Sequence, residues 1–355
     1  MLANALALAA LCAAVAHAGA DTITRPDSIL YLSTDFLSFL HNAEFHNEFR
    51  EGETILGSIV NGRVAVKATP RMSFSLGLHL RKQYGDERFL SDIRPLFQAC
   101  YRQQAFSLIL GEVLFTPTRH GLPDGLLREE FTYDPGVEEG VQVLYLGTTV
   151  SQDLWLTFSA LNTEDHREHL SGGNCTRIRL GPVCLSAMAY IDHYGGEAFA
   201  PAGDPVRENA AGAGGVTFTH AIERVVEELG AEQFVLGSYT ARDRSHDDPY
   251  ESGWGSLSRG WVKVLGFLCR FSYFQGHDYV AWNGNALYQS NEPYYSLHVS
   301  KRMAFPGKVF LEFGGRLEFV GIGPAEYGSR GEHVIWLQMG MDFRRLLIPG
   351  SLAEF

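Results

Sequence analysis

The chain has 355 residues, of which 45% are hydrophobic and 12% aromatic, and its formal net charge is −12. This acidic balance argues against a nucleic-acid binder, which would carry a basic balance or a patch rich in Lys and Arg. The 38 glycines and the scarcity of long helical patterns beyond the N-terminus favour an all-β protein with many turns.

The first twenty residues form a short apolar run that ends in small residues. Ala16-His17-Ala18 and Ala18-Gly19-Ala20 both have the small-x-small form of a signal-peptide cleavage site, although no Lys or Arg precedes the run. An uncleaved anchor is the alternative, but the run is short for crossing a bilayer. We therefore predict a cleaved export signal at 1–20 and a single outer-membrane barrel domain at 21–355.

The stretch 71–81 alternates strictly between apolar and polar residues, which predicts a strand with one apolar and one wet, partly basic face. The two rows are Met72, Phe74, Leu76, Leu78 and Leu80, and Arg71, Ser73, Ser75, Gly77, His79 and Arg81. The same pattern recurs at 183–192, 265–273, 309–319 and 335–344.

The repeated alternation predicts about sixteen strands, within a range of 14–18. They are 28–40, 54–68, 71–81, 92–102, 105–113, 140–147, 152–160, 174–180, 183–192, 214–223, 232–241, 260–275, 279–289, 294–302, 308–320 and 332–344. Tight and long connections mostly alternate along the chain, as in an antiparallel transmembrane β-barrel with short periplasmic turns and longer extracellular loops.

The apolar rows can face lipid or a protein core, because a soluble sandwich or lipocalin also alternates. Many segments reach nine to eleven residues or more, which is enough to cross a bilayer at a tilt. Aromatic residues also lie near segment ends, where membrane barrels carry aromatic girdles. These residues are Tyr84, Tyr101, Trp155, Tyr194, Trp261, Trp282, Tyr294 and Trp336. We favour the membrane barrel, and no later apolar run is long enough for a polytopic helical protein.

The chain resembles the bacterial outer-membrane porin-like barrels over most of its length. Asn42 to Gly57 (NAEFHNEFREGETILG), Val137 to Gln142 (VEEGVQ) and Asp153-Leu154-Trp155 are also similar to a poorly characterised family of exported barrels. The resemblance implies an outer-membrane location in a Gram-negative-type bacterium and is compatible with a pore, but it names no substrate.

If the apolar row faces lipid, the opposite row faces an aqueous lumen, which a barrel of this size is wide enough to hold. The predicted pore-lining residues are Arg71, His79, Arg81, Arg94, Arg102, Arg177, Arg179, Arg270, Glu312, Arg316 and Glu318, together with Arg344. An Arg-rich wall favours anions. The alternative, that these arginines pair with acidic residues of infolded loops and brace the wall, stays open.

Other candidate sites are weaker. The long 114–139 segment, with Arg119, His120, Arg128, Glu129 and Glu130, can fold inward as a constriction, but we favour an extracellular cap. The charged segment 164–169 (EDHREH) resembles a metal site, yet its His pair has no third ligand and a solvated loop fits it better.

The four cysteines beyond the apolar run show no zinc-knuckle spacing. Cys175 and Cys184 are close in sequence, but a tight turn at Gly181-Pro182 would place Cys184 opposite residue 179. We expect four small buried or lipid-facing thiols rather than a disulfide.

No Gly-x-Ser-x-Gly or His-Glu-x-x-His motif is present, while a Ser–His pair assembled across strands would leave no sequence signal. The leading hypothesis is a porin-like channel for passive or weakly selective diffusion of small polar solutes, with anions favoured. The alternatives are a membrane-embedded barrel enzyme acting on lipid or polysaccharide, and an exported soluble β protein that binds a ligand. The expected partners are outer-membrane lipid and small polar solutes, with no nucleic acid, no cofactor and no metal, and a homo-oligomer stays open.

Overall fold

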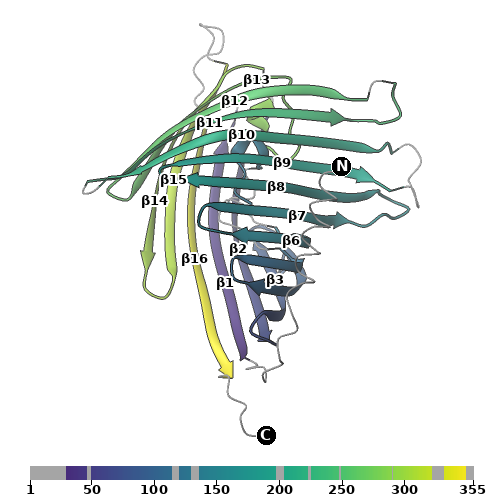
Figure 1. Cartoon of the computed structure of the whole chain (residues 1–355), viewed down its shortest axis with the longest axis vertical. Helices are drawn as coiled ribbons and strands as arrows, with labels where there is room; N and C mark the ends of the chain where they lie inside the picture. Colours follow the sequence, from purple (N-terminus) through teal and green to yellow (C-terminus); the bar gives the residue numbers. More distant parts are fainter. Residues whose placement is uncertain are drawn as a thin grey trace.

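Sixteen antiparallel strands form a closed barrel in the computed structural model, in which each strand pairs with its sequence neighbours and β1 pairs with β16 (Figure 1). The structure describes residues 29–45, 49–113, 120–128, 136–196, 204–222, 225–247, 249–289, 291–321 and 332–348. The predicted fold class, an antiparallel transmembrane β-barrel, is confirmed. The predicted export signal lies outside the described residues, as does Phe355.

The strand bounds follow the sequence closely in the first half of the barrel. They are β1 Ile29–Glu44, β2 Glu53–Lys67, β3 Met72–Gln83, β4 Asp92–Gln103, β5 Phe106–Glu112, β6 Glu139–Leu146, β7 Val150–Ala160 and β8 Glu168–Leu180. The second half consists of β9 Val183–Gly195, β10 Arg207–Ala221, β11 Val226–Ala241, β12 Glu251–Val264, β13 Phe267–His277, β14 Tyr294–Phe305, β15 Val309–Val320 and β16 Glu332–Ile348.

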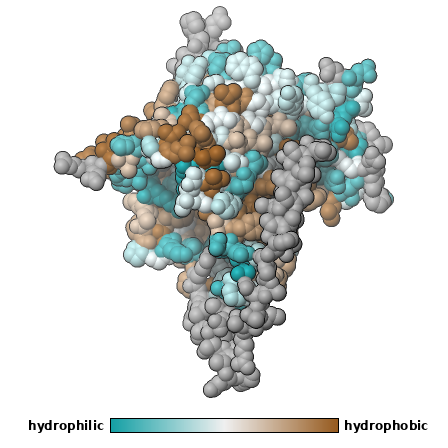
Figure 2. All heavy atoms as spheres, in the orientation of Figure 1, coloured by the Kyte–Doolittle hydropathy of each residue, from teal (hydrophilic) through white to brown (hydrophobic). Residues whose placement is uncertain are grey.

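The alternating rows point their apolar side chains outward. Leu76 of β3 pairs with Val64 of β2 and Phe97 of β4, and these three side chains are 67%, 45% and 51% exposed. Brown areas lie over the strands in Figure 2, while teal gathers at the loop ends. A soluble protein rarely leaves such a contiguous apolar surface in water, and this belt is what a lipid-facing barrel wall requires.

The predicted strand at 260–275 is wrong, because the structure divides it into β12 and β13. Leu265 and Gly266 form the two-residue turn between them, with φ of +51° and +76°. Positive φ at both positions is the type I′ geometry of the tightest hairpins, and a leucine at its first position gives no turn signal.

The predicted strand at 279–289 is also wrong, because this segment is a loop that contains the short 3₁₀ helix η2, Ala286–Gln289. The two errors cancel, so the predicted number of strands agrees with the structure. The β13–β14 loop turns into the barrel, and its apolar side chains, which suggested a strand, pack against the inner wall.

Several connections are shorter than predicted, among them 224–231 and 242–259, since β11 begins at Val226 and β12 at Glu251. β8 begins at Glu168 rather than 174, and β10 begins at Arg207 rather than 214. The Gly- and Ala-rich sequence of β10 resembles a loop because small residues replace the large apolar ones on much of its length. The cysteine register is as expected: Cys184 pairs with Arg179, and Cys100, Cys175, Cys184 and Cys269 are free.

The predicted extracellular cap at 114–139 is wrong for residues 120–128, which fold into the barrel. Leu126, in the 3₁₀ helix η1 (Asp124–Leu126), is 1% exposed. The Tyr279 hydroxyl donates to the Gly125 carbonyl at 2.9 Å, and the Asn285 amide donates to the Asp124 carbonyl at 3.0 Å.

The two infolded loops therefore form one plug. Its buried side chains pack against inward-facing side chains of the wall in a single hydrophobic cluster. From the loops these include Leu122, Leu126, Leu127, Tyr279, Leu287 and Tyr288, and from the wall Phe234, Leu236, Leu257, Phe274 and Tyr294. None of the helices in the described ranges is long and apolar enough to cross a membrane.

The positive φ of Gly266 predicts that any side chain at this position destabilises the protein. Gly266→Ala forces a Cβ into the left-handed region and should lower the free energy of unfolding by about 1–2 kcal/mol. No neighbouring atom crowds the new Cβ, since the nearest lies at 3.5 Å. Urea unfolding in detergent measures the loss. Gly62→Ala is the matched control, because nothing lies within 4 Å of its built Cβ and its φ is ordinary. Equal stability of the two variants would contradict the turn assignment.

Candidate functional site

A serine, a histidine and an aspartate from three neighbouring strands form a hydrogen-bonded chain at the loop end of the barrel. The Ser159 hydroxyl lies 2.6 Å from Nδ1 of His169. Nε2 of His169 lies 2.9 Å from Oδ1 of Asp192. With the ring proton on Nε2, the imidazole donates to Asp192 and accepts from the serine. The three groups are connected in the order of a Ser-His-Asp triad, with the two ring nitrogens exchanged relative to the serine-protease arrangement.

The three members differ in exposure in the way that such a site requires. Asp192 is 2% exposed, the His169 side chain is 21% exposed, and Ser159 is an exposed residue. The buried carboxylate orients the ring, and the hydroxyl stays accessible to a substrate.

An irregularity in strand pairing presents the serine. On β7 and β8, Phe158 pairs with Leu170 and Ala160 pairs with His169, so Ser159 has no partner residue of its own. A β-bulge of this kind changes the direction of a side chain near a strand end. The bulge accordingly turns the Ser159 hydroxyl toward His169.

A set of neighbours holds Asp192 and the imidazole in place. The Ser171 hydroxyl donates to Oδ1 of Asp192 at 2.8 Å, and the Asn283 amide donates to Oδ2. The ring of Tyr194 stacks on His169 with centroids 4.0 Å apart. Because Asn283 belongs to the β13–β14 loop, the plug itself helps to fix the triad.

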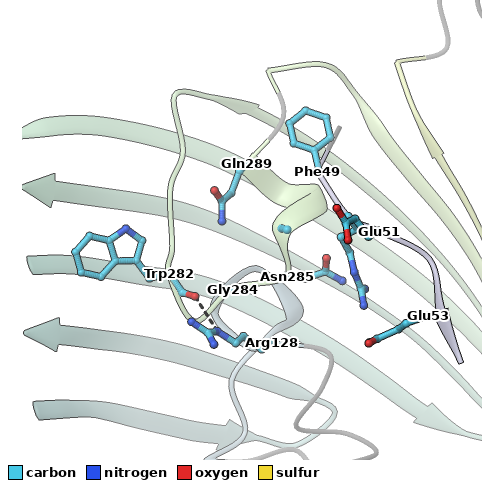
Figure 3. A pocket seen from close by; sticks show the side chains of 10 residues that line it. Phe49, Glu51, Glu53, Arg128, Trp282, Gly284, Asn285 and Gln289 are labelled. Atoms are coloured by element: carbon cyan, nitrogen blue, oxygen red, sulfur yellow. Dashed lines mark hydrogen bonds between the residues drawn. The ribbon is translucent and has the colours of Figure 1, made fainter. Parts of the chain in front are cut away.

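An open cavity of about 390 Å³ lies next to this site (Figure 3). It is lined by Phe49, Arg50, Glu51, Glu53, Arg128, Trp282, Gly284, Asn285, Ala286 and Gln289. Nε of Arg128 donates to the Trp282 carbonyl at 2.9 Å, shown as a dashed line in Figure 3. The Trp282 ring meets the edge of Tyr194 with centroids 5.9 Å apart, which connects the cavity to the triad.

A second buried histidine has a different environment. His120, on the plug, has Nδ1 at 2.8 Å from Asp153 and Nε2 at 3.2 Å from Glu138. Its ring stacks on Trp155 with centroids 3.7 Å apart and an interplanar angle of 5°. The His120 side chain is 1% exposed, so this cluster fastens the plug to the wall and is closed to a substrate.

The predicted pore-lining residues fall into two groups. Several contact other inner side chains or the plug: His79 lies 2.8 Å from Asn61, Arg177 donates to the Gly121 carbonyl, and Arg270 lies 3.3 Å from His298. On β15, Arg316 lies 2.8 Å from Glu318. These contacts favour the wall-bracing alternative for this group.

The other group is more open. Arg94 lies 2.7 Å from Asp92, and Glu312 lies 3.5 Å from Arg302. Arg71, Arg102 and Arg179 are exposed, and Arg81 is half-buried. The Arg344 side chain lies outside the described residues. Pore lining stays a prediction for the whole set.

Ser159 and Asp192 carry no signal that sequence patterns reveal, because their partner, His169, lies on another strand. His169 belongs to the segment predicted as a solvated loop, and that prediction is wrong for this residue, which begins the pairing of β8 and stacks on Tyr194. Across the described ranges, no group of three or more His, Cys, Asp and Glu residues has the arrangement of a metal site.

Comparison with known proteins adds the family. Residues 23–312 match the model of the family described as lipid A 3'-O-deacylase-type. The chain belongs to this family. The matched range contains Ser159, His169, Asp192 and every residue that lines the cavity. The chain matches no curated protein sequence.

Solved structures agree on the fold. The chain is similar to OmpT of Vibrio cholerae with loop L8 deleted, an outer-membrane protein (8% identity, TM-score 0.56, covering 89% of this chain and 100% of that one). It is also similar to OpdO of Pseudomonas aeruginosa (8% identity, TM-score 0.52, covering 91% and 98%). The resemblance to outer-membrane porin-like barrels is thereby confirmed, and at such low identity it concerns the fold alone.

The contacts of His120 predict that its replacement lowers the stability of the plugged barrel. His120→Phe keeps a ring against Trp155 but removes the imidazole contacts to Asp153 and Glu138, so the free energy of unfolding should fall by about 3 kcal/mol. Urea unfolding in detergent measures it. His246→Phe is the control, since that histidine also lies beside an aspartate, Asp243, but its side chain is 73% exposed. The control should change stability by less than about 0.5 kcal/mol. Similar losses in both variants would refute the anchoring role.

Proposed function

We propose that the protein is an outer-membrane hydrolase that removes an ester-linked acyl chain from a glycolipid of the lipid A type. The observation that carries the proposal is the hydrogen-bonded chain Ser159–His169–Asp192, in which the hydroxyl is exposed and the carboxylate buried. The family description, lipid A 3'-O-deacylase-type, supports the choice of an acyl ester as the bond that is cleaved.

The chemistry follows from the order of the three groups. The Ser159 oxygen attacks the ester carbonyl while Nδ1 of His169 takes its proton, and the imidazolium that forms is stabilised by Asp192 through Nε2. His169 then gives the proton to the departing sugar hydroxyl, and an acyl-serine remains. Water, deprotonated by the same ring, releases the fatty acid and restores the serine.

The site lies where such a substrate would be in an outer leaflet. β7 ends at Ala160, and the side chains of Phe158 and Leu161 beside it are 49% and 75% exposed. These apolar groups can contact acyl chains, while Ser159 faces inward at the same height. A membrane glycolipid places its ester bonds at this boundary between chains and sugar.

The plug also favours hydrolysis over diffusion. Leu126, Tyr279 and Tyr288 are each 1% exposed inside the barrel and occupy space that an open channel would need. The same loops supply Asn283 to the triad, so they belong to a built site.

Serine replacement tests the proposal directly. Ser159→Ala should lower kcat/KM by about 10³-fold or more, because the nucleophile is lost. Asp192→Asn should lower it by about 10²–10⁴-fold, because the imidazole loses its orienting carboxylate. Release of fatty acid from a lipid A-type glycolipid in mixed micelles, followed by mass spectrometry, measures both variants.

Ser151→Ala is the matched control, since Ser151 lies on the same strand, near its turn end. A fluorophosphonate probe should label the wild-type chain and the Ser151→Ala variant but not Ser159→Ala. Full activity of Ser159→Ala, or labelling at another serine, would refute Ser159 as the nucleophile.

A channel for small polar solutes is the second candidate. What favours it is the exposure of several basic side chains, Arg71, Arg102 and Arg179, near the turn end of the barrel. In a planar bilayer with a KCl gradient, a channel should show single-channel conductance and a reversal potential of anion preference. Charge reversal of Arg71 or Arg102 should then shift the potential toward cations. Absence of conductance in a folded barrel would remove this candidate and leave the hydrolase untouched.

A further inference from the structure

We propose that the outer wall over β7 to β12 is an interface at which a second copy of this chain docks within the membrane. Figure 1 shows these strands side by side, in the order in which they pair. Their outward side chains differ from the large apolar ones of the belt around Leu76. The centre of the interface is a strip of small residues on β9, β10 and β11, which we call the small-residue strip. Its members are Ala187, Ala189, Gly212, Gly214 and Gly237.

The pairing register makes the small-residue strip continuous across three strands. Gly214 of β10 pairs with Ala187 of β9. Two residues further toward the loop end, Gly212 pairs with Ala189 on one side and with Gly237 of β11 on the other. Five positions on one face therefore carry either no side chain or a single methyl group, so that the surface is low and flat.

The small-residue strip lies within the lipid-facing belt and away from its edges. On β9 itself, Ile191 toward the loop end and Leu185 toward the turn end lie on the same face and are 52% and 43% exposed. Val235 of β11, which pairs with Gly214, is 63% exposed. Large outward apolar side chains thus border the strip along and across the strands.

A group of polar side chains forms the first flank of the strip, on β7 and β8. Thr176 pairs with Gln152 on one side and with Ala187 on the other, and Asn174 pairs with Ala189. The Thr176 hydroxyl donates to Oε1 of Gln152 at 2.6 Å, and Nε2 of Gln152 donates to Oδ1 of Asn174. The Asn174 amide nitrogen donates to the Thr176 hydroxyl at 3.5 Å. Two amides and a hydroxyl therefore face outward at the level of the strip.

A second polar group forms the opposite flank, on β11 and β12. Gln233 is exposed and pairs with Ser258, while Ser256 pairs with Val235 beside it. Nε2 of Gln233 donates to the Ser256 hydroxyl at 2.9 Å, and the Ser258 hydroxyl donates to Oε1 of Gln233. The strip is thus bordered on both sides by amide and hydroxyl groups.

Polar flanks of this kind favour a protein partner over lipid. Hydrocarbon offers no hydrogen-bond partner, so an amide that faces it costs free energy. Each amide has two N–H donors and an oxygen with two lone pairs, and the bonds within each flank use only part of this capacity. Another protein surface can pair with the remainder, and small residues allow two membrane-embedded surfaces to approach closely.

The partner that matches this surface is a second copy of the chain. Rotating a copy about an axis along the membrane normal brings strip against strip, and it sets the first flank of each copy beside the second flank of the other. Both flanks contain amides and hydroxyls, so donors meet acceptors at both contacts. The strip and its flanks, all within the described residues, carry no charged side chain that would call for an oppositely charged partner. Closed symmetric assembly is also the common form of self-association.

Light scattering of the full chain in mild detergent tests the proposal. The wild type should have the protein mass of at least two chains. Gly214→Leu should weaken association by at least about tenfold, because a large side chain separates the two strips. Nothing lies within 4 Å of a Cβ built at Gly214, so the barrel should still fold, which heat-modifiable migration on a gel checks.

Gly62→Leu is the matched control. Gly62 of β2 pairs with Leu78, which is 50% exposed, so it also faces outward, and nothing lies within 4 Å of its built Cβ. It lies on the far side of the closed barrel from β10. The variant should associate like the wild type. Equal loss of association in Gly62→Leu and Gly214→Leu would overturn the assignment of this face.

Gln233→Leu separates an interface from a lipid-exposed wall. If Gln233 faces a second copy, the variant should weaken association about tenfold. A more stable barrel of unchanged mass would mean that the side chain faces lipid, and this result would overturn the proposal.

Cross-linking in outer-membrane fragments identifies the partner. With a short bismaleimide, Ala189→Cys should give a band of two chains, whereas Val64→Cys, on the far wall, should not. A monomeric wild type without this band, or cross-linking of Ala189→Cys to a different protein, would overturn the second copy as the occupant.

Discussion

Closure of the sheet is the constraint on which the rest of this molecule depends. In lipid no water satisfies a free backbone N–H or C=O group, so a strand-built membrane protein must pair its first strand with its last. Here Leu32 to Glu44 of β1 pair without interruption with Arg345 to His333 of β16. Once the barrel is closed, each strand has one face in lipid, and the other faces an interior that must be filled with water, charge or protein.

The interior is filled by two means, and the second produces the candidate site. In one part of the interior charged groups neutralise one another, as where Arg63 of β2 bridges Asp35 of β1 at 2.7 Å and Glu112 of β5. Toward the loop end, apolar side chains of two infolded loops pack against the wall. Burying loops costs free energy unless their backbone groups are paired, and the bonds to Gly125 and Asp124 meet part of this requirement. The plug thus becomes a rigid support on which Asn283 and Trp282 have fixed positions.

The sequence predicted the wall well and the interior poorly, for one physical reason. The period-two pattern reports only which side of a strand meets lipid, and this was enough to identify the rows around Leu76, Phe271 and Leu317. It says nothing about a loop that turns inward, since the apolar residues of 279–289 are buried as thoroughly as those of a strand. The triad was invisible for a related reason: Ser159 becomes significant only through a bulge that shifts it beside His169 on the next strand.

The β13–β14 loop is the element at which folding and the proposed chemistry meet. Its Tyr279 and Tyr288 anchor it in the plug, its Asn283 holds Asp192, and its Gly284 to Gln289 segment lines the cavity. A loop that served only to fill space would need the first of these contacts and neither of the others. An amide that donates to a buried carboxylate holds that carboxylate in one direction, and the Asp of a triad requires such a fixed direction. The arrangement also explains how one barrel wall can carry a site: three strands supply the serine, histidine and aspartate side chains, and the infolded loop adds a second side to this flat surface.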